Sequence, residues 1–383
     1  MTTITVLAGE RTIGGTQIVV EDGGARLLFD CGLAYDPAGD PFAPVRRRPW
    51  RLLPDLLALG LAPHIPGLYD RRITGGATDG IPLTLPPVDG PLAVALSHAH
   101  LDHTHLVGFV EPEVAVHCTV ATARIVRVLG EVGYSLGPAG RSFTPHESDQ
   151  PFAVGPMRVR FLPVDHDVAG ACGMLIETSD GTIAYSGDLR LHGAAPARSL
   201  RFVQAARVAG ARVLIIEGTQ LAPPQLDELL APVRPPRAER EVVTDAMDAL
   251  SRAPTKLGLI LLTPEHGARV EALATAMAEL GRLLVLDADG LAFATAALGR
   301  PLAAPHAVYV PGALARARQR EEVLPAARHR RGPAGRHGAG DRARTGRVPA
   351  AAGVGGLRRS GRSRTRWRGG RAAARQRDAT GPL

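Results

Sequence analysis

The stretch SHAHLDH at residues 97–103 places three histidines and an aspartate directly after the apolar run of residues 91–96. Alternate residues of an extended segment face the same way, so His98, His100 and Asp102 can converge. A turn at the end of the segment can bring in His103 as well. Imidazole and carboxylate groups are the ligands that zinc and similar divalent metals prefer. The stretch therefore predicts part of a metal site where a buried strand runs out into a loop.

Two later strands also end on possible ligands. The strand expected at residues 157–164 stops just before His166, and the strand expected at residues 182–185 is followed by Asp188. These six side chains exceed what one four-coordinate metal needs, whereas two divalent ions about 3.5–4 Å apart, bridged by a carboxylate and a hydroxide, would use them all. We therefore expect a dinuclear centre, with zinc as the metal. The alternatives are a solvated histidine-rich loop at residues 97–103 and a turn or cap residue at Asp188.

Short strands dominate the pattern over the first 220 residues. They are expected at residues 3–6, 17–20, 26–29, 114–117, 157–164, 174–177, 182–185 and 213–216. The dipeptide Asp180-Gly181 marks a hairpin between two of them. A helix is expected at residues 119–129, and residues 34–90 indicate a long surface excursion with a short helical piece at residues 52–61.

The rhythm changes at about residue 221. A Pro-rich joint at residues 223–236 leads into alternating helices and strands, with helices expected at residues 239–252, 265–280 and 290–298 and strands at residues 257–262 and 283–286. Such alternation is typical of a parallel α/β layer. The sequence therefore predicts a first domain over residues 1–220 and a second, partial α/β domain over residues 221–322.

The positive charge is concentrated at the end of the chain. The total formal charge is +8, but residues 323–383 hold sixteen arginines against two aspartates, or +14, which leaves −6 for residues 1–322. One explanation of this Arg-, Gly- and Ala-rich segment is a disordered basic tail that binds RNA by charge. The other is a shifted reading frame in a GC-rich gene, which the single lysine, Lys256, among 45 basic residues favours.

The remaining composition indicates a globular cytoplasmic protein. Cys31, Cys118 and Cys172 are scattered, so they indicate buried thiols rather than a disulfide framework. There is no run of 18 apolar residues and no signal-peptide pattern at the start, so we expect no membrane association.

Four motifs together resemble the metallo-β-lactamase superfamily, an αββα sandwich with a dinuclear metal site at one edge. They are H-x-H-x-D-H at residues 98–103, F-D-C-G at residues 29–32, the histidine at 166, and S-G-D ending at residue 188. The lactamases proper have a cysteine where this chain has Asp188. The segments V-D-H-D-V-A-G, S-G-D-L-R, L-I-I-E-G-T and L-L-T-P-E-H-G-A-R-V-E-A-L look like the β-CASP branch of RNA-processing nucleases, of the ribonuclease J and cleavage-factor kind.

That resemblance implies roles for the site residues. It implies one metal on His98, His100 and His166, a second metal on Asp102 and His103, and Asp188 bridging them. It implies that Asp30 is a buried carboxylate that orients the ligand loop, and that Glu217 lies near the proton-transfer machinery. The catalytic residues that it implies are therefore Asp102, Glu217 and Asp30.

The resemblance also implies a function, metal-assisted hydrolysis of RNA phosphodiester bonds, with RNA as the partner and a homodimer as a further expectation. One departure bears on this function. In the β-CASP branch a late H-x-S-G-H stretch completes the shell of the second metal, and this sequence has none, as expected of a truncated or frameshifted chain. The alternatives are a metallo-hydrolase of small esters or thioesters, and a catalytically impaired RNA-binding remnant.

Overall fold

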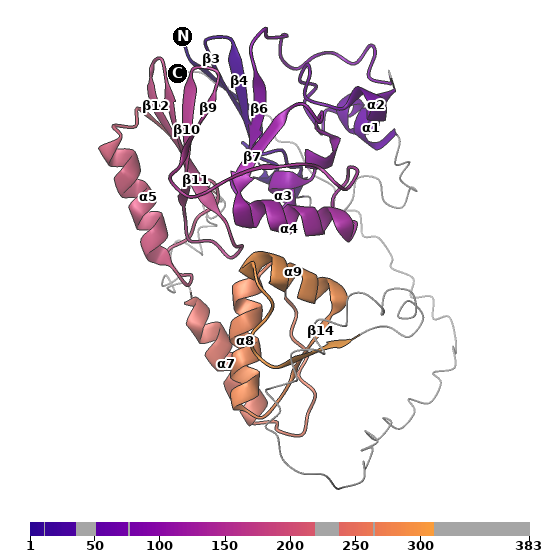
Figure 1. The fold of residues 1–383 in the computed structure, drawn as a ribbon, viewed down its shortest axis with the longest axis vertical. Helices are drawn as coiled ribbons and strands as arrows, with labels where there is room; N and C mark the ends of the chain where they lie inside the picture. Colours follow the sequence, from indigo (N-terminus) through magenta and orange to yellow (C-terminus); the bar gives the residue numbers. More distant parts are fainter. Residues whose placement is uncertain (11, 36–50, 76, 219–236, 263–264, 310–383) are drawn as a thin grey trace, which may run out of the picture. The chain divides into compact units, whose positions relative to one another are not determined.

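The computed structural model describes residues 1–10, 12–35, 51–75, 77–218, 237–262 and 265–309 (Figure 1). The predicted Pro-rich joint and the predicted basic tail at residues 323–383 lie outside the described residues. Within the described part, no helix combines the length and the apolar character needed to cross a lipid bilayer.

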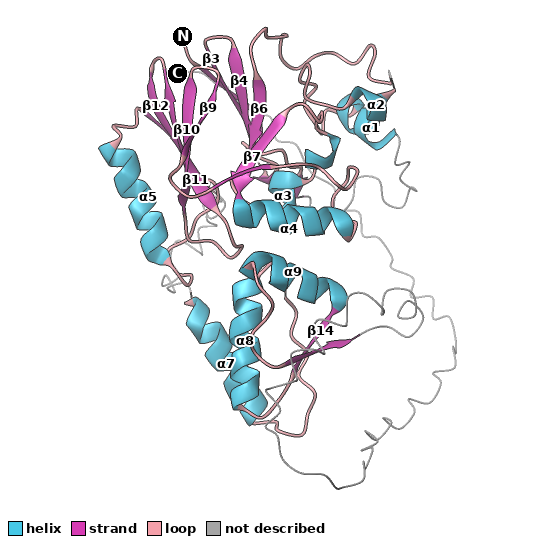
Figure 2. Cartoon of the chain, in the orientation of Figure 1, coloured by secondary structure: helices cyan, strands magenta, loops and turns pink. Residues whose placement is uncertain are grey.

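Two sheets form the first part of the structure (Figure 2). The six-stranded sheet has the order β1 (Thr3–Ala8), β3 (Gln17–Asp22), β4 (Ala25–Phe29), β6 (Leu92–Ala95), β7 (Ala115–Thr119) and β8 (Thr144–His146). The five-stranded sheet has the order β13 (Val213–Ile215), β12 (Gly181–Tyr185), β11 (Cys172–Thr178), β10 (Met157–Pro163) and β9 (Pro151–Val154). A separate two-stranded pair joins β2 (Ile13–Gly14) to β5 (Ala34–Tyr35).

The helices of this part are α1 (Leu52–Ala58), α2 (Arg71–Thr74), α3 (Leu101–Thr104), α4 (Val120–Glu131), α5 (Pro196–Val208) and the 3-10 helix η2 (Val107–Phe109). Alternation along the strands explains how they are layered. Val20 and Phe29 point into the core between the two sheets, whereas their neighbours Val19 and Leu28 pack with α1 on the outer face of the first sheet. On the outer face of the second sheet, Phe202 of α5 packs in one cluster with strand residues. The arrangement is the expected helix, sheet, sheet, helix sandwich.

The second part contains α7 (Glu239–Ser251), α8 (Gly267–Glu279), β14 (Leu284–Asp287), α9 (Ala288–Leu298) and β15 (His306–Tyr309). β14 and β15 pair in parallel, as the predicted α/β alternation requires. Val270, Met277 and Leu284 belong to its core. Other side chains of α9, including Phe293, pack in one cluster with Ile125 of α4.

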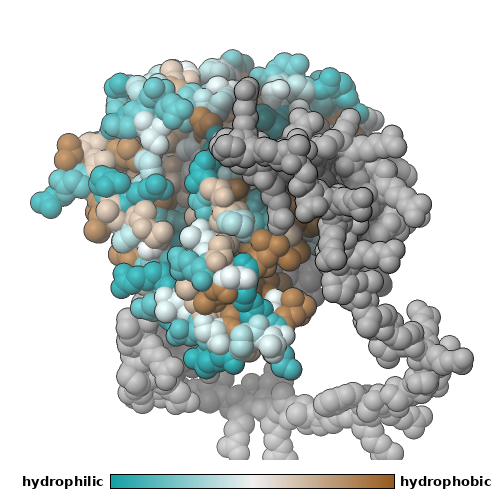
Figure 3. Space-filling view, turned by 60° about the horizontal axis from the view of Figure 1, so that its bottom comes forward, coloured by the Kyte–Doolittle hydropathy of each residue, from teal (hydrophilic) through white to brown (hydrophobic). Residues whose placement is uncertain are grey.

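One expected strand was wrong. Residues 257–262 form no strand in the structure, and Leu257, Leu259 and Leu261 are between 83% and 100% exposed. Hydrophobic side chains are exposed beside hydrophilic ones on the face that Figure 3 presents. The apolar alternation of this segment suits a strand, but a strand also needs a hydrogen-bonded neighbour, and in the described residues β14 and β15 pair only with each other.

Candidate metal centre

The predicted ligands lie beyond the carboxyl ends of β6, β10 and β12. β6 ends at Ala95, and the next residues carry His98 and His100 in an irregular segment. The expected extended geometry does not continue to Asp102, because the short helix α3 begins at Leu101 with His100 as its N-cap. Helical curvature, rather than alternation along a strand, therefore turns Asp102 and His103 toward the site.

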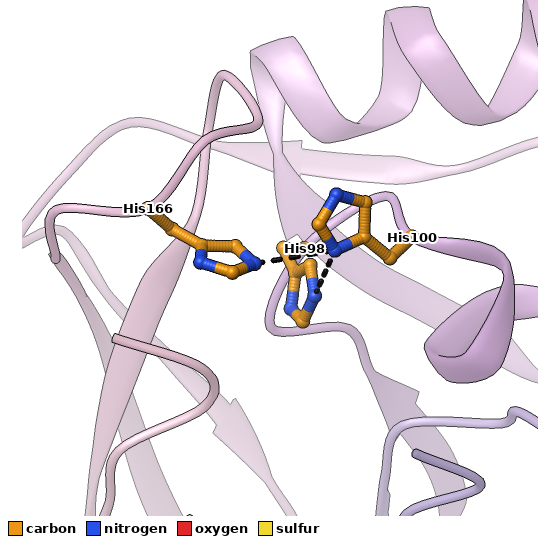
Figure 4. Close-up of side chains that lie close together, drawn as sticks. All are labelled: His98, His100 and His166. Carbon is orange, nitrogen blue, oxygen red and sulfur yellow. Dashed lines mark hydrogen bonds between the residues drawn. The ribbon is translucent and has the colours of Figure 1, made fainter. Parts of the chain in front are cut away.

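Three imidazoles converge on one point (Figure 4). His100 Nδ1 lies 3.1 Å from His98 Nε2 and 3.2 Å from His166 Nε2. A ring nitrogen has one proton or one lone pair, so His100 Nδ1 can serve only one of these contacts as a hydrogen bond. Two nitrogens on a tetrahedral zinc ion, each at the usual distance of about 2 Å, lie about 3.3 Å apart. The three nitrogens therefore fit a cation better than they fit one another.

A second group of ligand atoms lies beside the first. His103 Nε2 is 3.5 Å from Asp188 Oδ1 and 3.8 Å from Asp102 Oδ2. The other oxygen of Asp188 is 3.9 Å from His98 Nε2. His98, His103 and Asp188 thus form a second cluster that can hold a metal, and the carboxylate of Asp188 lies between the two clusters. Five of the six residues that the sequence proposed as ligands lie in these two clusters, and the sixth, Asp102, lies beside the second cluster through its contact with His103.

Asp30 supports this arrangement from below. Its side chain is fully buried and accepts hydrogen bonds from the backbone and hydroxyl of Ser97, at 2.7 and 2.8 Å, and from the hydroxyl of Tyr185 at 2.5 Å. It also lies 2.9 Å from His103 Nδ1. The backbone of Asp30 has a φ of +57°, a conformation that non-glycine residues rarely adopt and that costs of order 1–3 kcal/mol. The hydrogen bonds offset that strain.

The electrostatics of the site favour a bound cation. Burial and the neighbouring imidazoles lower the pKa of His98 well below its usual value, and burial lowers the pKa of His166 to about 4. Both rings are therefore neutral and offer lone pairs at pH 7. Burial opposes protonation of His103 too, but the carboxylates of Asp30 and Asp188 outweigh it and raise the pKa of His103 well above its usual value. These carboxylates require a positive charge beside them.

The F-D-C-G stretch packs directly under the ligand loop. Cys31 donates a backbone hydrogen bond to His103, and Gly15 donates one to Asp102. A Cβ atom on Gly32 would lie 1.6 Å from the carbonyl oxygen of Asp102, so only glycine allows this close approach. The stretch therefore holds α3, and with it the predicted ligands Asp102 and His103, against the first sheet.

Glu217 lies next to the site without joining either cluster. Its Oε1 accepts a hydrogen bond from the backbone of Leu189 at 3.0 Å, and its own backbone donates to Ser186 Oγ at 3.1 Å. Both bonds hold the loop that carries Asp188. The proton-transfer role of Glu217 stays a prediction.

Sequence reasoning missed two residues of the site, Asp167 and His266. Together with His100 they form a third group of close ligand atoms. Burial favours the neutral acid of Asp167, but the hydrogen bond from His266 and the surrounding imidazoles lower its pKa well below the usual range. Asp167 follows a predicted ligand in V-D-H-D, which could have drawn attention to it, whereas nothing in the sequence connects position 167 to position 266.

Comparisons with known proteins agree with this architecture. The model of the beta-lactamase superfamily domain matches residues 77–266. Ribonuclease J of Mycolicibacterium smegmatis is 26% identical over 191 residues, a match that covers 49% of this chain and 28% of the relative. The crystal structure of a protein of unknown function from Enterococcus faecalis V583 is similar with a TM-score of 0.67 and 27% identity, covering 81% of this chain and 71% of that one. Residues 77–266 are thus similar to the beta-lactamase superfamily domain.

Proposed function

We propose that this chain, which has the metallo-beta-lactamase fold, is a hydrolase, and that it acts as a ribonuclease that cleaves phosphodiester bonds at a dinuclear metal centre. The observation that carries the proposal is the convergence of His98, His100, His103, His166 and Asp188 in two adjoining clusters of possible ligand atoms, with Asp102 beside His103. The similarity to ribonuclease J of Mycolicibacterium smegmatis, over less than a third of that protein, supports RNA as the substrate.

The ligand atoms divide naturally between two cations. His98, His100 and His166 would hold the first through their converging nitrogens. Asp102 and His103 would hold the second, and Asp188 would contact both because its two oxygens face different imidazoles. Imidazole and carboxylate donors suit zinc and related divalent metals.

Bound divalent cations would make a water molecule more acidic and offset the negative charge that develops on the phosphoryl oxygens. The side chains of this protein orient the ligand groups. Asp30 fixes the ring of His103 by accepting from Nδ1, which leaves Nε2 free on the side of Asp188. The carboxylate of Asp102, about a quarter exposed, would accept the proton of the attacking water.

The test is cleavage of a labelled single-stranded RNA by the full chain reconstituted with zinc or manganese. We expect cleavage that disappears with chelator and in the variants His100→Asn and Asp188→Asn. His306→Gln is the matched control, because His306 lies in the second part of the structure and hydrogen-bonds only the carbonyl of Ala304 among the bonds found for its ring. This variant should cleave at the native rate.

Two results would count against the proposal. If the Asp188→Asn variant still cleaves RNA in the presence of chelator, the nuclease activity has another origin. Metal-dependent hydrolysis of a small ester or thioester, with RNA left intact, would favour the alternative substrate class.

A further inference from the structure

Asp167 connects the three-histidine cluster to the second part of the structure. Its Oδ2 lies 2.8 Å from Nε2 of His266, the residue that precedes helix α8. Its Oδ1 lies 3.4 Å from Nε2 of His100 and 3.4 Å from Nε2 of His166. That oxygen is buried and has no hydrogen-bond partner in the described part of the chain. A buried carboxylate oxygen without a donor needs an explanation, since leaving it unpaired costs free energy.

The neighbouring Arg269 determines which ring nitrogen of His266 carries the proton. Arg269 Nη1 lies 3.0 Å from His266 Nδ1, and a guanidinium group can only donate. His266 Nδ1 must therefore accept, which places the ring proton on Nε2, facing Asp167. Arg269 is itself fixed, because its guanidinium makes two hydrogen bonds to Glu239 at 2.5 and 2.8 Å. His266 is 6% exposed, and its ring contacts Arg269 on one side and Asp167 on the other.

The same reasoning applies to His100. Its Nδ1 faces the nitrogens of His98 and His166, so a cation bound there takes the lone pair of Nδ1. A neutral imidazole that binds metal through Nδ1 carries its proton on Nε2. Nε2 faces the free oxygen of Asp167. Metal-binding histidines commonly donate their other ring proton to such a carboxylate, which fixes the ring and makes it a better ligand.

We propose that Asp167 and His266 are positioning residues for the three-histidine cation site. His266, fixed by Arg269, holds Asp167 by one oxygen, and the other oxygen accepts the Nε2 proton of His100 and keeps Nδ1 turned toward the cation. The second part of the structure thereby sets the metal affinity of a site whose ligands all belong to the first. The proposal rests on the proposed metal centre. A further cation between His100, Asp167 and His266 is not required, and it would force His100 to bind metal through both nitrogens.

The experiment measures binding of cobalt(II) and zinc(II) to the full chain by competition with a chromophoric chelator, together with the visible spectrum of the cobalt form. For Asp167→Asn and His266→Leu we expect the native number of bound ions, a 10- to 100-fold weaker affinity for the first ion, about the range known for such supporting carboxylates, and a shifted cobalt spectrum. His266→Gln keeps an N–H donor toward Asp167 and should stay within about threefold of native. Arg300→Ala, which breaks an exposed ion pair with Glu271 in the same part of the structure, should change nothing.

The outcomes separate this inference from the proposed function. A native chain that binds two ions, with unaltered affinity and spectrum in Asp167→Asn and His266→Leu, overturns the inference and leaves the metal centre standing. Loss of one whole ion in Asp167→Asn also overturns it, because Asp167 would then be a ligand. A native chain that binds no divalent cation overturns the proposed function itself. Recovery of native affinity in His266→Gln but not in His266→Leu supports the inference, since a general packing defect would affect both.

Discussion

The hydroxyl of Tyr185 donates a 2.5 Å hydrogen bond to Asp30, and this bond joins the two sheets beside the candidate metal centre. Tyr185 ends β12 of the second sheet, and Asp30 follows β4 of the first. Burial and the adjacent carboxylate raise the pKa of Tyr185 well above its usual value, so the phenol keeps its proton and can donate at neutral pH. The bond is one of four that surround the carboxylate of Asp30.

Replacing Tyr185 by Phe removes this donor and leaves the buried carboxylate one partner short. We expect a loss of about 1–3 kcal/mol in the free energy of unfolding, measured by urea denaturation. Tyr134→Phe, at a tyrosine that is 45% exposed, is the control and should stay within about 0.5 kcal/mol of native. Equal stability of the two variants would show that the bond between the sheets contributes nothing.

Gly32→Ala tests the contact between the F-D-C-G stretch and the ligand loop. The added methyl group would meet the backbone of Asp102, which cannot move without shifting α3. We expect a loss of stability of about 3 kcal/mol or more, with weaker zinc binding. Gly130→Ala is the control, because a Cβ there meets its neighbours at 3.6 Å in a regular helix and should be neutral or slightly stabilising. A Gly32→Ala protein as stable as Gly130→Ala would contradict this account.

A buried histidine away from the site predicts a pH dependence. His117 stacks on Phe152, and burial followed by the nearby ring of His146 lowers its pKa to about 4. The unfolded chain, with an ordinary histidine pKa of about 6.5, therefore binds this proton more readily than the folded chain. Stability is fully present above pH 6.5 and falls as the pH drops from about 6.5 to 4.

His117→Phe keeps an aromatic ring in the stack and removes the titrating group. Between pH 7 and 4 the free energy of unfolding of this variant should fall by up to about 3 kcal/mol less than that of the native protein. The measurement is urea unfolding at each pH. Because both proteins retain the histidines of the site, the difference between the two curves reports on His117 together with His146, whose Nε2 lies 2.8 Å from His117 Nδ1. Parallel curves would show that His117 is not held neutral in the folded state.

Metal removal should destabilise the chain. Ligand atoms that converge only after folding bind the cation in the folded state, so zinc at a free concentration 100 times its dissociation constant should add about 2.7 kcal/mol per site. The measurement compares the unfolding of the chain in zinc and in chelator. The gain should shrink in Asp188→Asn and persist in His306→Gln. Superimposable unfolding curves for the native chain would argue against a built metal site.

The sequence predicted the ligand cluster because its members follow strands. Apolar runs locate β6, β10 and β12, and the polar residues directly after them lie on the same side of the sandwich because these strands end there. The hairpin at Asp180-Gly181 and the pairs β1, β3 and β4 were likewise predictable, since turn chemistry and alternation are local. The point at which each strand ends is harder to predict. The sequence suggested an extended segment through Asp102, whereas in the structure helix α3 begins at Leu101 and carries Asp102.

What could not be predicted depends on contacts between distant segments. His266 meets Asp167 only because α8 packs where it does, and no spacing rule relates the two. Helix α5 was missed because Leu200, Val203 and Val208 are exposed and blur the apolar stripe that identifies an amphipathic helix. The strand expected at residues 257–262 was wrong for the opposite reason, because a suitable pattern found no partner.

The candidate ligands follow strands of both sheets, and His98 and Asp188 are 90 positions apart in the sequence. In an unfolded chain such distant donors meet rarely, because closing a long loop costs entropy. We therefore expect the full ligand set to form, and an ion to be held tightly, only after the two sheets have docked. Its retention becomes a measure of completed assembly: a substitution that loosens the interface between the sheets would release metal even where it touches no ligand.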